Sequence, residues 1–191
     1  MYFDGEGLFQ ITEEELVRVF SVAFARMLER DRMLFEETNP QERAFMHRFA
    51  QELRRELSFV EDYRRKGKPV LSLDVEYNRD GKERKTPEGI YDPREYRWIA
   101  PDIIFHERGS KEHEFRNDIF ACEMKKHSSP NEADAERLKT EFLDRRKYQY
   151  GIDFYQCAQE PYEFNLYRQQ GGCRSYFFNP AKKVFTVKTD R

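Results

Sequence analysis

The spacing of apolar residues changes along this 191-residue chain, and that change most constrains its fold. In the first third, apolar side chains recur every three or four positions, which is typical of amphipathic helices. From Val70 onward they alternate with polar side chains, as in strands. Helical spacing returns once, between residues 131 and 143. A chain of this order is expected to fold as an α/β protein around a sheet.

Capping residues mark where the expected helices begin. Thr12 followed three residues later by Glu15 is a capping box. Residues 39–42 (NPQE) and 129–132 (SPNE) each combine an N-cap residue, a proline and an acid. The sequence therefore predicts helices over 12–36, from 39 and from 129, and strands over 70–77, 97–106, 118–126, 150–158, 162–168, 175–179 and 184–188.

Composition excludes several classes of protein. Charged residues make up 37% of the chain, but aromatic residues reach 15%, enough to fill a core, so disorder is not expected. The formal net charge of -2 argues against a surface covered in positive charge for nonspecific phosphate binding. Cys122, Cys157 and Cys173 form no CxxC motif, which favours a reduced, cytoplasmic protein. No signal peptide or apolar span is visible, so no membrane partner is expected.

Two apolar strands carry acids where a core rarely tolerates them. Asp102 lies within residues 98–105 (WIAPDIIF), and Glu123 lies within 119–125 (IFACEMK). A buried carboxylate without a partner is costly, so each needs a cation, a basic group or a strand end at solvent. Strand alternation places Glu123 and Lys125 on one face. If Asp102 lies across from them, the three groups suit a hydrolytic magnesium site, because Mg²⁺ prefers oxygen ligands and keeps several waters.

Pro101-Asp102 followed by Glu123-Met124-Lys125 resembles the PD-(D/E)XK nuclease superfamily. The expected elements of residues 39–158 also resemble its restriction-endonuclease-like αβββαβ core, and the strands at 74–79 and 100–104 are similar to those of a subgroup of small bacterial proteins. The resemblance implies a central mixed β-sheet flanked by helices, with an extra N-terminal helix and C-terminal strands outside the core. We expect one domain over residues 1–191, a length that suits a single core.

The same resemblance implies the chemistry. Asp102, Glu123 and the Met124 backbone carbonyl would bind Mg²⁺ or Mn²⁺, and Lys125 would be the catalytic lysine. The reaction would be phosphodiester hydrolysis, with DNA as the expected substrate and RNA as the alternative. A strand-edge salt bridge between Lys125 and the two acids is the structural explanation of the same three residues.

Other acids have two explanations each. Many members of the superfamily carry a glutamate on the helix before the first core strand, and Glu42 is the first candidate, as a catalytic residue and metal ligand. Glu42 also occupies the position where a capping box requires an acid. Glu52 is the second candidate, or part of a solvated helix face. Asp74 and Glu76 share a strand face and either join the site or form the wet side of an edge strand.

Basic residues cluster in the sequence around these strands and are candidates for nucleic-acid contacts, although solvated helices and loops look much the same. The basic candidates are Lys126, Arg145, Arg146 and Lys147, together with Arg79, Lys82, Arg84 and Lys85.

Two alternatives to a nuclease stay open. One is a module on the same fold that binds nucleic acid or protein without cleavage. The other is a structural protein whose first helix, residues 12–36, forms a homodimer or docks a protein partner. His106, His113 and His127 match no zinc spacing.

Overall fold

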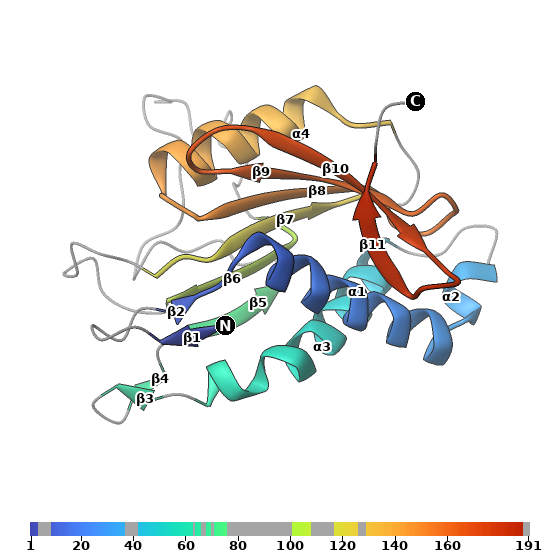
Figure 1. The fold of residues 1–191 in the computed structure, drawn as a ribbon, viewed down its shortest axis with the longest axis horizontal. Coiled ribbons are helices and arrows are strands. Elements are labelled where there is room, and N and C mark those ends of the chain that lie inside the picture. The colour runs from blue at the N-terminus through green and yellow to red at the C-terminus, as the bar shows by residue number, and fades with distance from the viewer. Residues whose placement is uncertain are drawn as a thin grey trace, which may run out of the picture.

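Seven strands form one sheet in the computed structural model, which describes residues 1–3, 9–36, 42–62, 64–65, 68–69, 71–75, 101–107, 117–125 and 129–188. These strands are β5 (Leu71–Val75), β6 (Ile103–Glu107), β7 (Phe120–Met124), β8 (Tyr150–Gln156), β9 (Glu163–Arg168), β10 (Cys173–Asn179) and β11 (Val184–Val187). Their order across the sheet is β11-β10-β9-β8-β7-β6-β5 (Figure 1). Strands β7 and β8 are parallel and the other neighbours are antiparallel, which confirms the expected mixed sheet.

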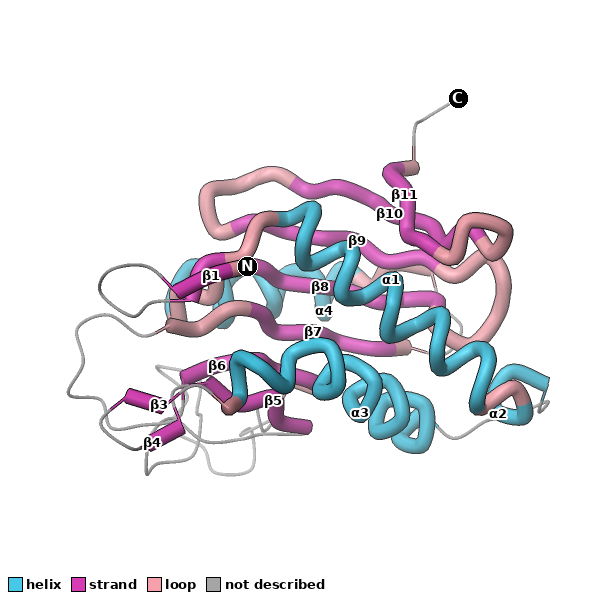
Figure 2. The backbone as a smooth tube through the Cα atoms, turned by 60° about the horizontal axis from the view of Figure 1, so that its bottom comes forward, coloured by secondary structure: helices cyan, strands magenta, loops and turns pink. Residues whose placement is uncertain are grey.

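Helices cover both faces of this sheet. Figure 2 shows α1 and α3 in front of the strands and α4 behind them. The first helix begins as predicted: the Glu15 amide donates to Thr12 Oγ1 at 3.2 Å, and the Thr12 amide donates to Glu15 Oε2 at 2.9 Å. Short antiparallel pairs join β1 (Tyr2–Phe3) to β2 (Phe9–Gln10) and β3 (Arg64–Arg65) to β4 (Lys68–Pro69). The helical segments are α1 (Glu13–Arg30), α2 (Met33–Glu36), α3 (Glu42–Glu61), α4 (Glu132–Arg137) and the π-helix η1 (Leu138–Arg145), which continues α4.

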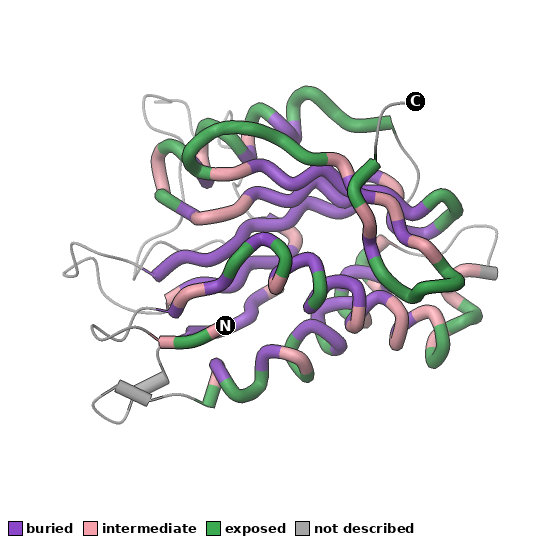
Figure 3. The backbone as a smooth tube through the Cα atoms, viewed as in Figure 1, coloured by how far each residue is buried: buried purple, intermediate pink, exposed green. Residues whose placement is uncertain are grey.

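The two faces of β7 meet different surroundings, because strand side chains alternate. Phe120, Cys122 and Met124 are buried in the main core, which they share with α1 and α3. Ala121 belongs to a second, smaller core under η1. Glu123 lies on that same η1 side and is also buried. Most residues of β7, β8 and β9, in the middle of the sheet, are buried (Figure 3).

Most strand boundaries differ from the prediction by one to three residues where they can be compared. The second strand ends at Glu107, one residue beyond the predicted end, and the third runs from Phe120 to Met124, inside the predicted range. Residues 76–100, which include the predicted start of the second strand, lie outside the described part of the chain. The helix predicted from residue 129 begins at Glu132, with Asn131 as its cap. It continues as a π-helix, which apolar spacing did not distinguish from an α-helix.

The first helix is not the free docking element that the sequence allowed. Its apolar stripe is buried inside the chain, against α3 and the sheet. Phe20 stacks edge-on with Phe49 of α3 and with Phe120 of β7. A dimer or partner would therefore need another surface of the molecule, because this apolar face is already covered.

Aromatic packing around Phe24 ties the N-terminal helix to the C-terminal strands. Phe24 is fully buried. Its ring centroid lies between 4.9 and 6.1 Å from six other aromatic rings, on α2, α3, β8, β10, β11 and the segment before β9. Removing this ring should loosen contacts between segments far apart in the sequence.

We expect Phe24→Ala to lower the free energy of unfolding by about 3–5 kcal/mol, because truncation loses burial and leaves a cavity. Phe59→Ala is the matched control, since Phe59 on α3 is 51% exposed and should change stability by roughly 0.5 kcal/mol or less. Urea denaturation measures both. Equal losses from the two variants would contradict the packing described here.

Candidate functional site

Asp102 reaches across to the motif strand, as the sequence predicts. Ile103 pairs with Cys122 in the antiparallel β6–β7 ladder, so Asp102 comes next to Glu123 at the end of β7. Asp102 Oδ2 accepts a hydrogen bond of 2.7 Å from the Met124 amide. The side chain is partly exposed. This bond fixes one carboxylate at the point where the strand carrying Glu123 and Lys125 ends.

Glu123 is almost sealed, with a relative exposure of 2%. Its Oε2 lies 2.9 Å from Arg137 Nη2, and the same nitrogen lies 2.9 Å from Asp134 Oδ1. Asn131 Nδ2 donates to the other Asp134 oxygen at 3.1 Å. Glu123 Oε1 has no hydrogen-bond partner among the described residues. One half of this carboxylate is therefore neutralised from α4, and the other half is not.

Lys125 and Glu42 meet at the rim of the site. Lys125 Nζ lies 3.6 Å from Glu42 Oε1, and both side chains are partly open to solvent. The Lys125 amide donates to the Phe154 carbonyl at 2.9 Å, and the Lys125 carbonyl accepts from the Cys157 amide at 3.1 Å. These two bonds hold the lysine backbone against β8. Glu42 is the first residue of α3, so the start of that helix brings it to the site.

Glu52, the second candidate on this helix, is not part of the site. It is buried between α1 and α3, where it pairs with Arg55 and lies 3.6 Å from Arg30. Residues 37–41 lie outside the described part of the chain, so the capping explanation of Glu42 stays untested. The structure thus brings Glu42, and not Glu52, together with the predicted three residues.

Burial dominates the electrostatics of this group. It raises the pKa of Asp102, against the Met124 hydrogen bond and the charge of Lys125. It raises the pKa of Glu123 to about 8, with Arg137 opposing and Asp102 adding to the shift. Burial alone would lower the pKa of Lys125, but Glu42 and Asp102 outweigh it and the net shift is upward. Burial therefore favours the protonated form of Glu123 at neutral pH, in spite of Arg137 beside it.

The sequence prediction missed three residues beside Glu123. Arg137 and Asp134 lie on α4, and their i, i+3 spacing directly after the motif strand was the available signal. Asp153, in β8, pairs in parallel register with Glu123. It is fully buried, neither of its oxygens has a hydrogen-bond partner among the described residues, and burial raises its pKa to about 6.

Asp74 is separate from this group. Asp74 Oδ2 lies 2.9 Å from His106 Nε2, and both side chains are buried on neighbouring strands. Asp74 pairs with Ile104 in the ladder, two residues beyond Asp102 along β6. Its partner on the predicted strand face, Glu76, lies outside the described residues.

Of the predicted nucleic-acid contacts, the described ones, Arg145, Arg146 and Lys147, are not brought to the predicted three residues. Arg145 ends η1 and lies 3.0 Å from Glu141, while Arg146 and Lys147 follow it. The Gln149 amide donates to the Asp118 carbonyl, which precedes β7, so this basic segment lies at the opposite end of the strands from Glu123. Its role stays a prediction. The other basic candidates, Lys126, Arg79, Lys82, Arg84 and Lys85, lie outside the described residues.

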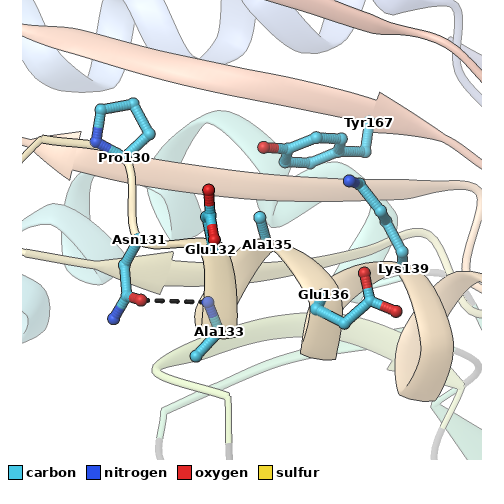
Figure 4. A pocket seen from close by; sticks show the side chains of 8 residues that line it. All are labelled: Pro130, Asn131, Glu132, Ala133, Ala135, Glu136, Lys139 and Tyr167. Carbon is cyan, nitrogen blue, oxygen red and sulfur yellow. Dashed lines mark hydrogen bonds between the residues drawn. The ribbon is translucent and has the colours of Figure 1, made fainter.

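A pocket of about 640 Å³ lies on the other side of α4 (Figure 4). Lys139 covers the Tyr167 ring at its wall, with Nζ 5.1 Å from the ring centroid. The Asn131 side chain accepts from the Ala133 amide at 3.0 Å and caps the helix at the pocket edge. Asp134 and Arg137 do not line it. The pocket is therefore distinct from the group around Glu123.

Within the described segments, no group of three or more His, Cys, Asp or Glu side chains is arranged to hold a metal ion. The oxygens that fit a cation are the unpaired Oε1 of Glu123 and the carboxylate of Asp102.

None of the helices in the described part of the chain has the length and apolar character to span a membrane. In comparisons with known proteins, no family model, curated protein or solved structure matches this chain.

Proposed function

We propose that this chain is a metal-dependent nuclease that hydrolyses phosphodiester bonds, with DNA as its substrate. The observation that carries the proposal is the bond from the Met124 amide to Asp102, which brings that carboxylate to the end of the strand bearing Glu123 and Lys125. Carboxylates with raised pKa values gathered beside a lysine are characteristic of sites that do chemistry. The chain order α3, β5, β6, β7, α4–η1, β8 supports the resemblance to the PD-(D/E)XK core.

Mg²⁺ or Mn²⁺ is the cofactor that we propose. Asp102 and Glu123 would hold it with the Met124 backbone carbonyl, because one or two carboxylates with waters and a substrate phosphate satisfy magnesium. A bound Mg²⁺ supplies a coordinated water of lowered pKa and positive charge at the phosphate. The unpaired Glu123 Oε1 supports this assignment, since it is a buried carboxylate oxygen with no hydrogen-bond partner among the described residues.

Lys125 would act as a cation and not as a base. Its raised pKa keeps the ammonium protonated at neutral pH, so it has no free lone pair with which to accept a proton. At the rim of the site it can donate to the attacking water or to a phosphate oxygen as negative charge develops. Glu42, 3.6 Å away, would orient it.

A duplex could touch both the site and the distant basic segment. The helix from Glu132 to Arg145 spans roughly 20 Å at 1.5 Å per residue. A duplex rises about 3.4 Å per base pair, so about six base pairs cover that length. Arg145, Arg146 and Lys147 would then contact backbone phosphates away from the cleaved bond.

The second candidate is a module on this fold that binds without cleavage. The observation in its favour is that Glu123 is nearly sealed and already paired with Arg137. A catalytic carboxylate in that state needs a rearrangement before it meets a substrate. Binding of DNA without cleavage under every metal condition would favour this candidate.

We expect Asp102→Asn and Lys125→Met each to lower metal-dependent cleavage by at least about a hundredfold, because each removes charge at the reacting phosphate. Asp102→Asn retains an acceptor for the Met124 amide, and Lys125→Met retains most of the side-chain length. The assay incubates plasmid, linear duplex, single-stranded DNA and RNA with Mg²⁺, Mn²⁺ or chelator. Asp144→Asn and Lys182→Met, both at exposed positions, are the matched controls. Cleavage that survives both site substitutions would rule out this site.

Glu123 also predicts how stability depends on pH without metal. Its pKa of about 8 in the folded chain exceeds the ordinary 4.5, so the folded state holds the proton more tightly. The stability gained from that proton is present below about pH 4.5 and is lost as pH rises through 8. We expect the loss to be on the order of 5 kcal/mol, measured by urea denaturation in chelator. Glu123→Gln, which cannot ionise, should flatten the curve; an unchanged slope would contradict the assignment.

A further inference from the structure

Asp153 is a buried carboxylate for which the described part of the chain provides no partner. It lies in the middle of β8 with a relative exposure of 0%. Neither Oδ1 nor Oδ2 has a hydrogen-bond partner among the described residues. A charged group in this state costs several kcal/mol, and even a protonated one loses a hydrogen bond that water would supply. The fold gains nothing from this residue type that an apolar side chain would not provide.

The position of Asp153 connects it with the candidate site. It is the parallel register partner of Glu123, so both side chains leave neighbouring strands on the η1 side of the sheet. Neighbouring strands lie about 4.8 Å apart. Glu123 Oε1 also lacks a partner among the described residues. Three buried carboxylate oxygens without partners therefore belong to two adjacent positions of the sheet.

The basic groups nearby do not neutralise Asp153. Arg137 lies 2.9 Å from Glu123 Oε2 and also pairs with Asp134. Lys125 favours the charged form of Asp153 only weakly, since burial and Asp134 together still raise the pKa of the Asp153 carboxyl. A cation from outside the chain is the partner that matches two adjacent, desolvated carboxylates.

We propose that Asp153 is a ligand for a divalent cation, Mg²⁺ or Mn²⁺, which it shares with Glu123 at the deep end of the site. Two carboxylates suffice for such a cation, because Mg²⁺ usually keeps several waters. This inference rests on the proposed function in that it uses the same cation, and it adds Asp153 to the ligands. Three adjacent strands then each supply one carboxylate: Asp102 from β6, Glu123 from β7 and Asp153 from β8.

The test compares the full chain with Asp153→Asn, which keeps the side-chain shape and removes the charge. We expect Asp153→Asn to weaken Mn²⁺ binding by about tenfold or more, at least the loss that follows removal of an outer-sphere partner. Isothermal titration with Mn²⁺ measures this, with circular dichroism to confirm folding. In chelator, we expect the melting midpoint of the variant to rise by a few degrees, because an unpaired buried charge is gone.

Asp118→Asn is the matched control. Asp118 is also buried, and its Oδ1 accepts from the Glu107 amide at 3.3 Å, at the other end of β7. This variant should melt lower in chelator and retain the full stabilisation by Mn²⁺, which raises the melting point by binding only the folded state. A ligand and a structural aspartate thus shift the melting midpoint in opposite directions, and only loss of the ligand weakens Mn²⁺ binding.

Three results from the variants would overturn the inference. They are unchanged Mn²⁺ affinity in Asp153→Asn, a melting midpoint that falls in chelator as in Asp118→Asn, and failure of both Asp153→Asn and the smaller Asp153→Ser to fold. Absence of Mn²⁺ binding by the unaltered chain would also overturn it. The proposed nuclease activity fails separately: Mn²⁺ binding that depends on Asp153, without cleavage of any nucleic acid, would sustain this inference and reject that function.

Discussion

The register of β6, β7 and β8 is the constraint on which the site depends. Phe120, Cys122 and Met124 pack into the core shared with α1 and α3, so β7 can present only its alternate residues to the other side. A slip of one residue would turn Glu123 into that apolar core and move Phe120 out of it. The hydrophobic effect therefore orients the acids, although the acids themselves contribute nothing to it. The site is positioned by the packing on the far side of the sheet.

Because the core pins the strands, the site can hold charge that is unfavourable for stability. Glu123 and Asp153 are buried, and burial raises the pKa of each. Replacing buried ionic groups with apolar ones is often neutral or stabilising. Stability therefore gives no reason for these residue types, whereas the proposed binding of a cation would give one. The aromatic cluster around Phe24 contributes stability that offsets the cost of burying these carboxylates.

Local sequence patterns were sufficient for much of this arrangement. The capping box at Thr12 and the short apolar strand around Glu123 were predictable from neighbours a few residues away. Convergence of Asp102 with Glu123 followed from two adjacent strands joined in chain order, which usually pair. The contact between Glu42 and Lys125 was predicted only in part. The resemblance suggested an acid on the helix before the first core strand, and only the tertiary packing distinguished Glu42 from Glu52.

What the sequence did not predict depends on the crossover from β7 to β8. Asp153 becomes the neighbour of Glu123 only through the parallel register, which no local pattern encodes. The same crossover carries Arg145 away from the site, because α4 and η1 run the length of the strands before the chain returns. Closeness in sequence to the motif strand was therefore misleading for Arg145.

Arg137 and the proposed divalent cation would bind different oxygens of the same carboxylate. Arg137 neutralises Glu123 Oε2 from α4 and is itself held by Asp134, so Glu123 keeps one fixed oxygen while the other stays available. An arginine is always charged, and its planar fork makes directional bonds. It can therefore orient Glu123 through Oε2 while Oε1 keeps no partner among the described residues. The proposed cation would meet a carboxylate whose orientation the helix has already set, and less ordering entropy would be lost on binding.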